Sequence, residues 1–226
     1  MLDTLRFAVA TEAGDPDDPP TVVHMDGTKK WRNAAGQLHR ESDPAIEHAD
    51  GTLEWYRHGE LHRKDGPAVE EANGTREWWI NGVRHRDDGP AVEEANGDCQ
   101  WWQHGQRHRE DGPAIEDVDG RAWWQHDAVH RADGPAIEYA DGSRVWYQYG
   151  QLHRDDGPAI EWTDGSREWW IGSREVAELP PGDHTKAEVD AKTLEVLDEA
   201  ARRGLITRHE AMAGRAKIRR RNTEAA

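Results

Sequence analysis

Residues 67–91 read PAVEEANGTREWWINGVRHRDDGPA, and this stretch decides the fold. Two Asx-Gly dipeptides, Asn73-Gly74 and Asn81-Gly82, separate three short runs of alternating polar and apolar residues. Asx-Gly between such runs is a strong hairpin signal, because both central residues of a type I′ turn need positive φ. The stretch therefore predicts three short antiparallel strands joined by two-residue turns.

Two-residue turns would also fix which residues of these strands face each other. The two predicted rows across the strands are Val69-Trp78-His85 and Ala68-Trp79-Arg84. Adjacent residues of a strand point to opposite faces, so each face of the sheet would carry one ring of the Trp pair.

The same pattern recurs along the chain with a period of about 23 residues. The dipeptide His-Arg recurs at His39, Arg40, His62, Arg63, His85, Arg86, His108, Arg109, His130, Arg131, His153 and Arg154. Asx-Gly dipeptides before the aromatic pairs begin at Asp26, Asp50, Asn73, Asn96, Asp119, Asp141 and Asp164. A fixed period of this length is typical of repeat architectures. Residues 21–172 are therefore expected to form seven β repeats in an elongated antiparallel β-hairpin sheet or solenoid, which makes the fold mainly β.

Tryptophan replaces the aliphatic residues that are scarce in this chain. Eleven of the 12 Trp follow an Asx-Gly dipeptide, alone or in pairs, and only Trp162 lies elsewhere. Core packing is the simplest interpretation of these rings. The alternative is a ladder of exposed ring faces that binds a partner, a sugar or a quaternary ammonium group. The candidate binding residues are Trp55, Trp79, Trp102, Trp124, Trp146 and Trp170.

The repeated histidines and arginines favour structural roles. Equivalent His residues in a three-strand repeat would lie too far apart to share one zinc ion, and six similar surroundings do not make one catalytic site. We expect each His to pack beside Trp and to bond to a loop. Each Arg of the dipeptide is expected to pair with a Glu beyond the Gly-Pro loop, and these are Glu47, Glu70, Glu93, Glu116, Glu138 and Glu161. No metal, cofactor or catalytic residue is predicted.

The formal net charge of −16 restricts the partners. An acidic balance disfavours direct binding to nucleic acid and to anionic membranes, and favours a basic partner. No run is long and apolar enough to insert in a bilayer. The first 14 residues lack a basic cluster and a long apolar stretch, so we expect no secretory signal and a cytoplasmic protein.

The tails differ in composition from the repeats. Residues 1–20 are expected to be a partly disordered lead-in, with Leu5, Phe7 and Val9 as a candidate capping strand. We expect residues 173–184 to be a linker, 185–221 a helical hairpin with a basic end, and 222–226 a tail. Thr185 with Glu188 fits a capping box, and Thr207 with Glu210 would open a second helix after Gly204. The basic tail comprises Arg215, Lys217, Arg219, Arg220 and Arg221. It is either a solvated end or a segment that docks on an acidic sheet, with nucleic-acid binding as a third reading.

The order of aromatic pair, Asx-Gly and Gly turns over residues 21–172 resembles the MORN-like variant repeats of bacterial proteins. This resemblance implies stacked antiparallel hairpins with a non-enzymatic role in protein or lipid contact. The His-Arg and Asp-Gly-Pro-Ala segments depart from the usual MORN signature. Residues 193–218 resemble a short SHOCT-type helical hairpin, which implies docking or a homo-oligomer through the C-terminal helices.

Taken together, these observations predict a non-enzymatic interaction or scaffold module that binds a protein partner through an acidic, Trp-rich β sheet. One alternative is a phage or bacterial conflict protein whose acidic surface mimics nucleic acid. Another is glycan or choline binding by the Trp ladder.

Overall fold

The computed structural model describes residues 19–179, 184–203, 205–206 and 208–224. The chain divides into two compact units, residues 1–106 and 107–226, which we call unit 1 and unit 2. Leu5, Phe7, Val9, Gly204 and Thr207 lie outside the described residues, so the predictions for them are not addressed by the structure.

Most of the strands belong to one antiparallel sheet, as the sequence predicts. Among the described residues fifteen strands form it, and because their hydrogen-bonded order starts at β1 and ends at β25, this described sheet is open. In unit 1 the sheet strands are β1 (Val22–Val23), β2 (Lys29–Lys30), β3 (Ile46–Glu47), β4 (Leu53–Glu54), β7 (Val69–Glu70), β8 (Arg76–Glu77), β11 (Val92–Glu93) and β12 (Cys99–Gln100). In unit 2 they are β15 (Ile115–Asp117), β16 (Gly120–Ala122), β19 (Ile137–Tyr139), β20 (Arg144–Val145), β23 (Ile160–Glu161), β24 (Arg167–Ile171) and β25 (Arg174–Leu179).

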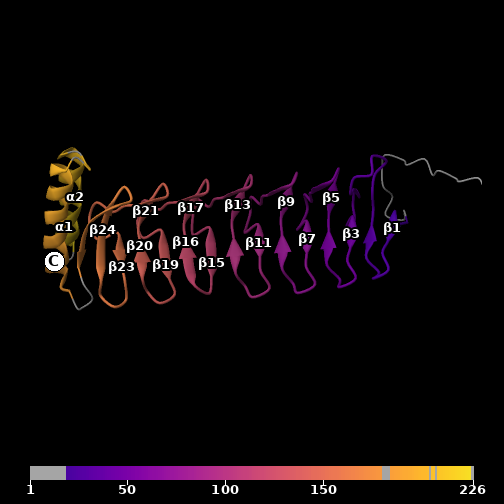
Figure 1. Cartoon of the computed structure of the whole chain (residues 1–226), viewed down its shortest axis with the longest axis horizontal. Helices are drawn as coiled ribbons and strands as arrows, with labels where there is room; N and C mark the ends of the chain where they lie inside the picture. The colour runs from indigo at the N-terminus through magenta and orange to yellow at the C-terminus, as the bar shows by residue number, and fades with distance from the viewer. Residues whose placement is uncertain (1–18, 180–183, 204, 207, 225–226) are drawn as a thin grey trace, which may run out of the picture. The chain divides into compact units, whose positions relative to one another are not determined.

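Five two-stranded hairpins stand apart from this sheet. They are β5 (Tyr56–Arg57) with β6 (Glu60–Leu61), β9 (Trp79–Ile80) with β10 (Val83–Arg84), β13 (Trp102–Gln103) with β14 (Gln106–Arg107), β17 (Trp124–Gln125) with β18 (Ala128–Val129), and β21 (Tyr147–Gln148) with β22 (Gln151–Leu152). Figure 1 shows the hairpins of each unit along one end of its sheet strands. The repeats that hold these five hairpins thus contribute two sheet strands and one separate hairpin each, rather than three strands of one sheet.

In the repeats with a separate hairpin, the chain leaves the sheet at the first Trp of the aromatic pair, whereas Trp169 stays within β24. Trp78 follows β8, and its backbone N–H donates to the carbonyl of Ala91 in the next repeat at 2.8 Å. His85 N–H donates to the Trp78 carbonyl at 3.1 Å, so these two residues face each other as predicted. The predicted pairing of Val69 with Trp78 is wrong, because Val69 is paired with Glu77.

The register differs because the first turn of the repeat is one residue longer than predicted. Glu71 N–H donates to the Thr75 carbonyl, and Gly74 N–H donates to the Glu71 carbonyl, both at 2.9 Å. Gly74 has φ +101°, whereas Asn73 is not among the residues with positive φ. These features define a three-residue loop, a type I turn closed by a left-handed glycine. It moves every following residue by one position against the opposite strand.

The second turn has the predicted type I′ conformation. Asn81 and Gly82 have φ of +50° and +75°, and Arg84 is paired with Trp79. Equivalent pairs in other repeats also have positive φ at both residues, including His126-Asp127, where glycine is absent. The sequence therefore predicts this hairpin correctly.

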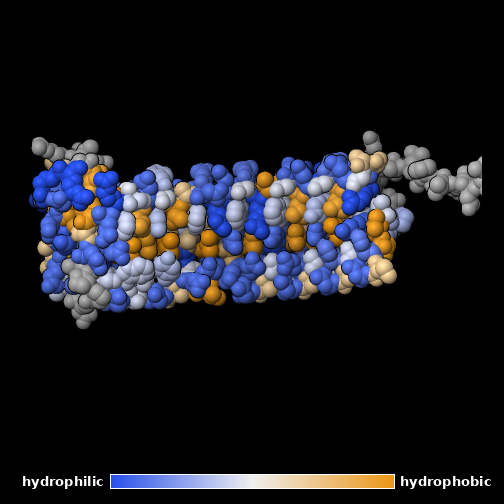
Figure 2. Space-filling model, viewed as in Figure 1, coloured by the Kyte–Doolittle hydropathy of each residue, from blue (hydrophilic) through white to orange (hydrophobic). Residues whose placement is uncertain are grey.

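The two faces of the sheet carry different side chains. Along one face, register pairs join residues of opposite charge, such as Lys29 with Glu47 and Arg121 with Glu138. Along the other face, an aliphatic residue on the first strand of a repeat is paired with a residue on the second strand. Val69 of β7, for example, is paired with Glu77 of β8. Figure 2 shows hydrophobic residues in short bands between hydrophilic ones on the visible face. Val92, Val145 and Ile160 are buried aliphatic residues on the sheet face that carries Val69.

Two helices follow the sheet in unit 2, and they contact each other. They are α1 (Lys186–Arg202) and α2 (Arg208–Glu224). Thr185 caps α1 with the predicted capping box, since Thr185 Oγ1 accepts from Glu188 N–H and Glu188 accepts from Thr185 N–H. The Glu188 carboxylate accepts from both the backbone N–H and the hydroxyl of Thr185, and these two hydrogen bonds lower its pKa.

The helices and the last strands share a hydrophobic cluster. Its buried members are Ile171, Leu197, Ala200, Ile206, Ala211 and Ile218. Trp169 is 1% exposed, and its indole N–H donates to Thr193 Oγ1 of α1 at 2.9 Å. These contacts hold the helix pair on the end of the sheet in unit 2. Within the described ranges, neither helix is long and apolar enough to cross a membrane.

Candidate interaction surface

An arginine lies on the first Trp ring of most repeats. We number the repeats 1 to 7 by that Trp, from Trp31 to Trp169. The guanidinium carbon of Arg86 lies 3.9 Å from the centroid of Trp78, and Arg63, Arg131 and Arg154 lie at the same distance from their rings. A cation over an indole face is attracted by its quadrupole, and here it also covers that face. The covered face is not available to a sugar or an ammonium ligand.

The same guanidinium holds the following loop, which we call the Gly-Pro loop. Arg86 Nη1 donates to the Pro90 carbonyl at 3.0 Å and to Glu93 at 2.8 Å. All six predicted Arg–Glu pairs form, with 2.7–3.0 Å in repeats 2 to 6 and 3.7 Å between Arg40 and Glu47 in repeat 1. The prediction of an ion-pair ladder is confirmed.

The glycine of this loop leaves space for the guanidinium, and its φ angle lies outside the left-handed region. A Cβ atom at Gly89 would lie 3.0 Å from the Arg86 guanidinium carbon, which is closer than van der Waals contact. Repeat 1 has Asp43 at this position, and there the Arg40 guanidinium lies 4.2 Å from the Trp31 centroid. The glycine therefore lets the arginine pack between the indole and the loop.

Each repeated histidine links its repeat to the next one. His85 Nδ1 accepts the backbone N–H of His104 at 3.2 Å, and the two imidazole rings stack with centroids 4.5 Å apart. The other five histidines accept a backbone N–H from the next type I′ turn in the same way. The histidines bond to a loop as expected, but this loop is the hairpin turn of the following repeat. Their Nδ1 atoms act as structural acceptors.

The Gly-Pro loops carry a row of acidic side chains. Asp87, Asp88, Glu110, Asp111 and Asp133 have 84–88% of their side chains exposed. The corresponding Asp155 and Asp156 of repeat 6 are only 25% and 31% exposed. The difference arises because α2 lies on the loop of repeat 6.

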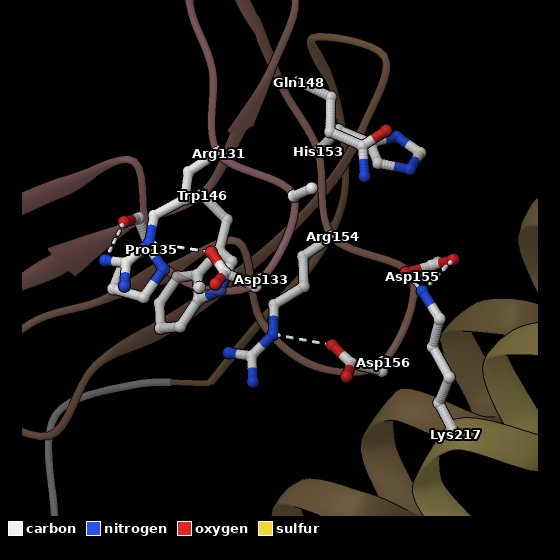
Figure 3. Close-up of a pocket in the computed structure, with 12 residues that line it drawn as sticks. Arg131, Asp133, Pro135, Trp146, Gln148, His153, Arg154, Asp155, Asp156 and Lys217 are labelled. Atoms are coloured by element: carbon white, nitrogen blue, oxygen red, sulfur yellow. Dashed lines mark hydrogen bonds and ion pairs between the residues drawn. The ribbon is translucent and has the colours of Figure 1, made fainter. Parts of the chain in front are cut away.

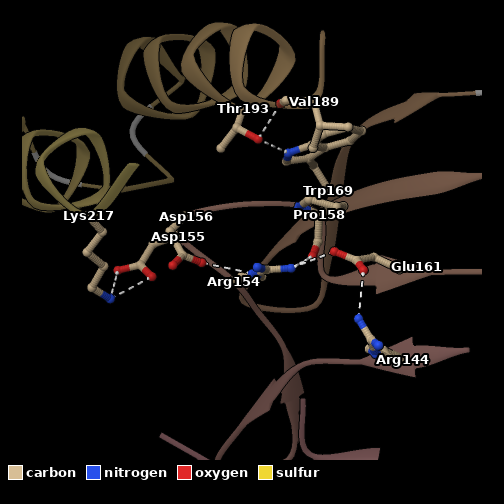
Figure 4. A network of polar contacts seen from close by, with 10 residues as sticks. All are labelled: Arg144, Arg154, Asp155, Asp156, Pro158, Glu161, Trp169, Val189, Thr193 and Lys217. Carbon is tan, nitrogen blue, oxygen red and sulfur yellow. Dashed lines mark hydrogen bonds and ion pairs between the residues drawn. The ribbon is translucent and has the colours of Figure 1, made fainter. Parts of the chain in front are cut away.

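A lysine of α2 makes the contact with this covered loop. Lys217 Nζ lies 3.0 Å from both carboxylate oxygens of Asp155 (Figure 4). Gly214 brings the α2 backbone against the Asp155 carbonyl so closely that a side chain would not fit. The basic tail thus includes one residue docked on an acidic loop of its own sheet.

The docked lysine closes a groove between two successive Gly-Pro loops. We call this the Lys217 groove, and it has a volume of about 420 Å³. Figure 3 shows Arg131 and Asp133 of one loop, Arg154, Asp155 and Asp156 of the next, and Lys217 entering from α2. An equivalent groove of about 320 Å³ lies in unit 1 between loops 41–42 and 64–65, and we call it the Lys64 groove.

The structure places the six candidate Trp residues at two different positions of the repeat. Trp55 and Trp146 hold the first position, under Arg63 and Arg154. Trp79, Trp102, Trp124 and Trp170 hold the second position and are partly buried. The indole nitrogens of three of them bond inside the repeat: Trp79 Nε1 donates to Glu77 at 2.7 Å, Trp102 Nε1 to Gln100 at 3.2 Å and Trp170 Nε1 to Glu168 at 2.8 Å. Trp124 Nε1 has no hydrogen-bond partner among the described residues.

The remaining residues of the basic tail have varied surroundings. Arg215 pairs with Asp198 of α1. Arg219 and Arg220 are exposed on α2, and the side chain of Arg221 lies outside the described part of the structure. Lys217 is thus a residue of the basic tail that the structure places on the repeat surface.

Sequence reasoning missed the polar partners of the second aromatic residue. The residue two positions earlier bonds to it, as Glu77 does to Trp79 and Gln100 to Trp102. In repeat 2, burial and the neighbouring Glu54 carboxylate raise the pKa of Tyr56 to about 12. A polar residue stands two positions before the second aromatic residue in repeats 2, 3, 4 and 7, and this was the available signal in the sequence. Repeats 5 and 6 have Ala122 and Val145 at that position.

The described part of the structure contains no group of three His, Cys, Asp or Glu side chains placed to hold a metal ion. Comparisons with protein-family models and with curated protein sequences find no match for the chain.

Proposed function

We propose that this chain is a non-enzymatic interaction module whose acidic Gly-Pro loops bind lysine and arginine side chains of a protein partner. The docking of Lys217 on Asp155 carries the proposal, because it is one occupied example of a loop that recurs in the repeats. The likeness to MORN-like variant repeats belongs to the same proposal, and so does a helix pair that docks or oligomerises.

The geometry of the loop supports a basic side chain as the ligand. Asp111 accepts from Arg109 Nε at 3.1 Å, which fixes the carboxylate but leaves 88% of the side chain exposed. Glu110 beside it is 87% exposed. Two carboxylates presented on a braced loop attract an ammonium or guanidinium group at low entropic cost.

The tryptophan rings contribute rigidity rather than contact in this proposal. Because Arg131 and Arg154 cover the rings of Trp123 and Trp146, the rings brace the loops from behind. The partner would then touch loop carboxylates and the polar rims of the grooves.

A peptide with the sequence of residues 208–224 tests the proposal, because it carries Lys217 in its native context. Fluorescence anisotropy of the labelled peptide should show binding to the full chain that weakens steeply between about 50 and 200 mM salt. A peptide carrying Lys217→Glu should bind more weakly.

Two matched double variants each remove two negative charges, one in a Gly-Pro loop and the other at the Asx-Gly turns. Glu110→Gln with Asp111→Asn should reduce binding several-fold, whereas Glu71→Gln with Asp98→Asn at the Asx-Gly turns should leave it unchanged. A complex that is insensitive to salt, or equal binding by both double variants, would contradict the proposal.

A further inference from the structure

One tryptophan lies outside the repeated aromatic pairs. Trp162 follows β23, at the start of the Asx-Gly turn of repeat 7, and 37% of the residue is exposed. Tyr139 holds the same position in repeat 6 and is 41% exposed. Repeats 3 and 4 have Glu71 and Glu94 at this position. The last two turns of unit 2 therefore present aromatic rings where the turns of repeats 3 and 4 present carboxylates.

The strand register places the two rings in one row across the sheet. Each ring stands two residues after an isoleucine, Ile137 in repeat 6 and Ile160 in repeat 7. Both isoleucines are paired with Val145 of β20, which lies between them. Two strand spacings therefore separate Tyr139 from Trp162, which is about 10 Å. A group midway between the rings would lie about 5 Å from each of them, within the reach of a cation–π contact.

Small residues flank the two rings in this row. Gly120 is paired with Tyr139 on one side, and on the other side Tyr139 N–H donates to the Ser143 carbonyl at 3.0 Å. Trp162 N–H donates to the Ser166 carbonyl at 3.1 Å across its own turn. Because a glycine or a serine is too short to cover an aromatic ring, these neighbours leave the exposed parts of both rings accessible.

The chain itself holds the Trp162 ring in place. Trp162 Nε1 donates to one oxygen of Glu168 at 3.0 Å, and Trp170 Nε1 donates to the other oxygen of this carboxylate at 2.8 Å. The Trp162 carbonyl accepts from Gly165 N–H at 3.2 Å, which closes the turn. A side chain that is fixed in this way loses little conformational entropy when a ligand packs on it.

Within the described ranges, no arginine or lysine lies over either ring. The paired tryptophans differ in this respect, since Arg86, for example, covers Trp78 at 3.9 Å. Arg167 stands near Trp162 in the sequence, but its Nη1 donates to the carbonyls of Trp162 and Ser166, at 3.1 and 2.8 Å. The two exposed rings thus lack the cation that the chain supplies to its paired tryptophans.

The turns that carry these rings are acidic. The aspartates two residues after each ring, Asp141 and Asp164, are exposed. Each of them accepts the backbone N–H of the serine two positions on, at 2.7 and 2.8 Å. The hydroxyl and the backbone N–H of Ser166 lower the pKa of the Asp164 carboxyl through their hydrogen bonds. An exposed ring beside a negative charge favours a cationic ligand.

We propose that Tyr139 and Trp162 form a binding site for an arginine side chain, whose guanidinium lies between the two rings and is paired with Asp141 or Asp164. Arginine fits better than lysine, because its planar guanidinium stacks on aromatic rings and is more weakly hydrated than an ammonium. The site lies at the opposite end of the sheet strands from the Gly-Pro loops. It gives the basic protein partner a second contact, and in this respect it rests on the proposed function.

Indole resonances of the full chain, measured by ¹H–¹⁵N correlation during titration with N-acetylarginine methylamide, test the site directly. The Trp162 indole signal, assigned with Trp162→Phe, should shift with a dissociation constant of roughly millimolar order. N-acetylcitrulline methylamide has nearly the same shape without the charge and should shift the signal much less. Tyr139→Gln should weaken binding several-fold. Glu71→Gln, at the same turn position of repeat 3, is the control and should leave the titration unchanged.

A Trp162 indole signal that does not move, or that moves equally with the citrulline compound, would overturn the proposal. An unchanged affinity in Tyr139→Gln would overturn it too. Glu110→Gln with Asp111→Asn separates this site from the proposed function, because it alters a Gly-Pro loop and should leave the Trp162 shift unchanged. Loop-dependent binding of the 208–224 peptide without a Trp162 shift by the arginine compound would refute the site and retain the proposed function.

Discussion

Repeat 1 and repeat 3 build the same contact between tryptophan and arginine with different loops. In repeat 3, Gly89 leaves room for the guanidinium, and Arg86 lies 3.9 Å from Trp78 and 2.8 Å from Glu93. In repeat 1, Asp43 replaces the glycine, and the corresponding distances are 4.2 Å and 3.7 Å. The comparison teaches that the missing side chain of one glycine sets how tightly the arginine is held.

Removal of the arginine from repeat 3 and from repeat 1, in separate variants, should give the largest difference in the free energy of unfolding. Arg86→Met removes the short bonds to Glu93 and Pro90 and the cation over Trp78, and should lower the free energy of unfolding by about 2–3 kcal/mol. Arg40→Met should cost about 1 kcal/mol, because its bonds are already long. Urea unfolding followed by tryptophan fluorescence measures both, and equal losses would contradict the role given to the glycine.

Gly89→Ala should convert repeat 3 toward the geometry of repeat 1. The added methyl group displaces the Arg86 guanidinium, and we expect a loss of about 1 kcal/mol in the free energy of unfolding. In the background of Arg86→Met the same substitution should cost almost nothing, since the guanidinium is then absent. A double-mutant cycle by urea unfolding measures this coupling, and strict additivity would show that the alanine acts elsewhere.

The reverse change should tighten repeat 1. Asp43→Gly alone removes the carboxylate that lies 3.4 Å from Arg40, so its benefit should be small. Ser42→Asp together with Asp43→Gly restores the Asp-Gly-Pro order of the other loops, and should raise the free energy of unfolding by about 0.5–1 kcal/mol. The thermal midpoint is a suitable measurement, and a double variant no more stable than the single one would refute the expectation.

The smallest effect concerns Tyr56 and Tyr147, which hold the same position in two other repeats. Burial comes first in raising the pKa of Tyr56 to about 12, followed by the hydrogen bond and charge of Glu54, whereas Val145 stands at that place before Tyr147. The pKa of Tyr56 in the folded chain exceeds that of an unfolded tyrosine. The neutral Tyr56 side chain therefore stabilises the fold fully below about pH 10, and this stabilisation is lost as the pH rises toward 12.

Phenolate absorbance during alkaline titration reports this difference. Glu54→Gln should lower the pKa of Tyr56, and Tyr56→Phe should remove the latest transition. An unchanged titration in Glu54→Gln would show that burial alone accounts for the raised value.

Much of the fold follows from the sequence, because the repeat fixes both spacing and chemistry. The Arg–Glu pairs are predictable since the two residues stand seven positions apart in every repeat. Asn81-Gly82 was also predictable, as its flanking residues alternate without interruption.

The first turn was not predictable from Asx-Gly alone. Asn73 Oδ1 accepts the N–H of Thr75 at 2.7 Å, and Asp26, Asp50, Asp141 and Asp164 accept from the residue two positions on in the same way. These bonds favour the longer turn, and they lower the pKa of Asp26 and Asp50. Asn96 of repeat 4 accepts from the backbone N–H of Asp98 in the same way, so the bond does not depend on a Thr or Ser after the glycine.

For the candidate site, the sequence predicts the basic tail but not the loop on which it docks. The basic tail stands out by composition, but its docking partner Asp155 is 62 residues away from Lys217 and has no periodic relation to it. The packing of the Arg guanidinium on the first Trp ring was also not predictable from the sequence, because it depends on the path of the Gly-Pro loop.

The histidine contacts between neighbouring repeats bear on how the chain acquires its structure during synthesis. Each joins residues only 18 or 19 positions apart. Loops of that length close quickly, and proteins rich in such local contacts fold fast. A repeat can therefore complete its packing as soon as the next hairpin leaves the ribosome, without waiting for the C-terminal helices.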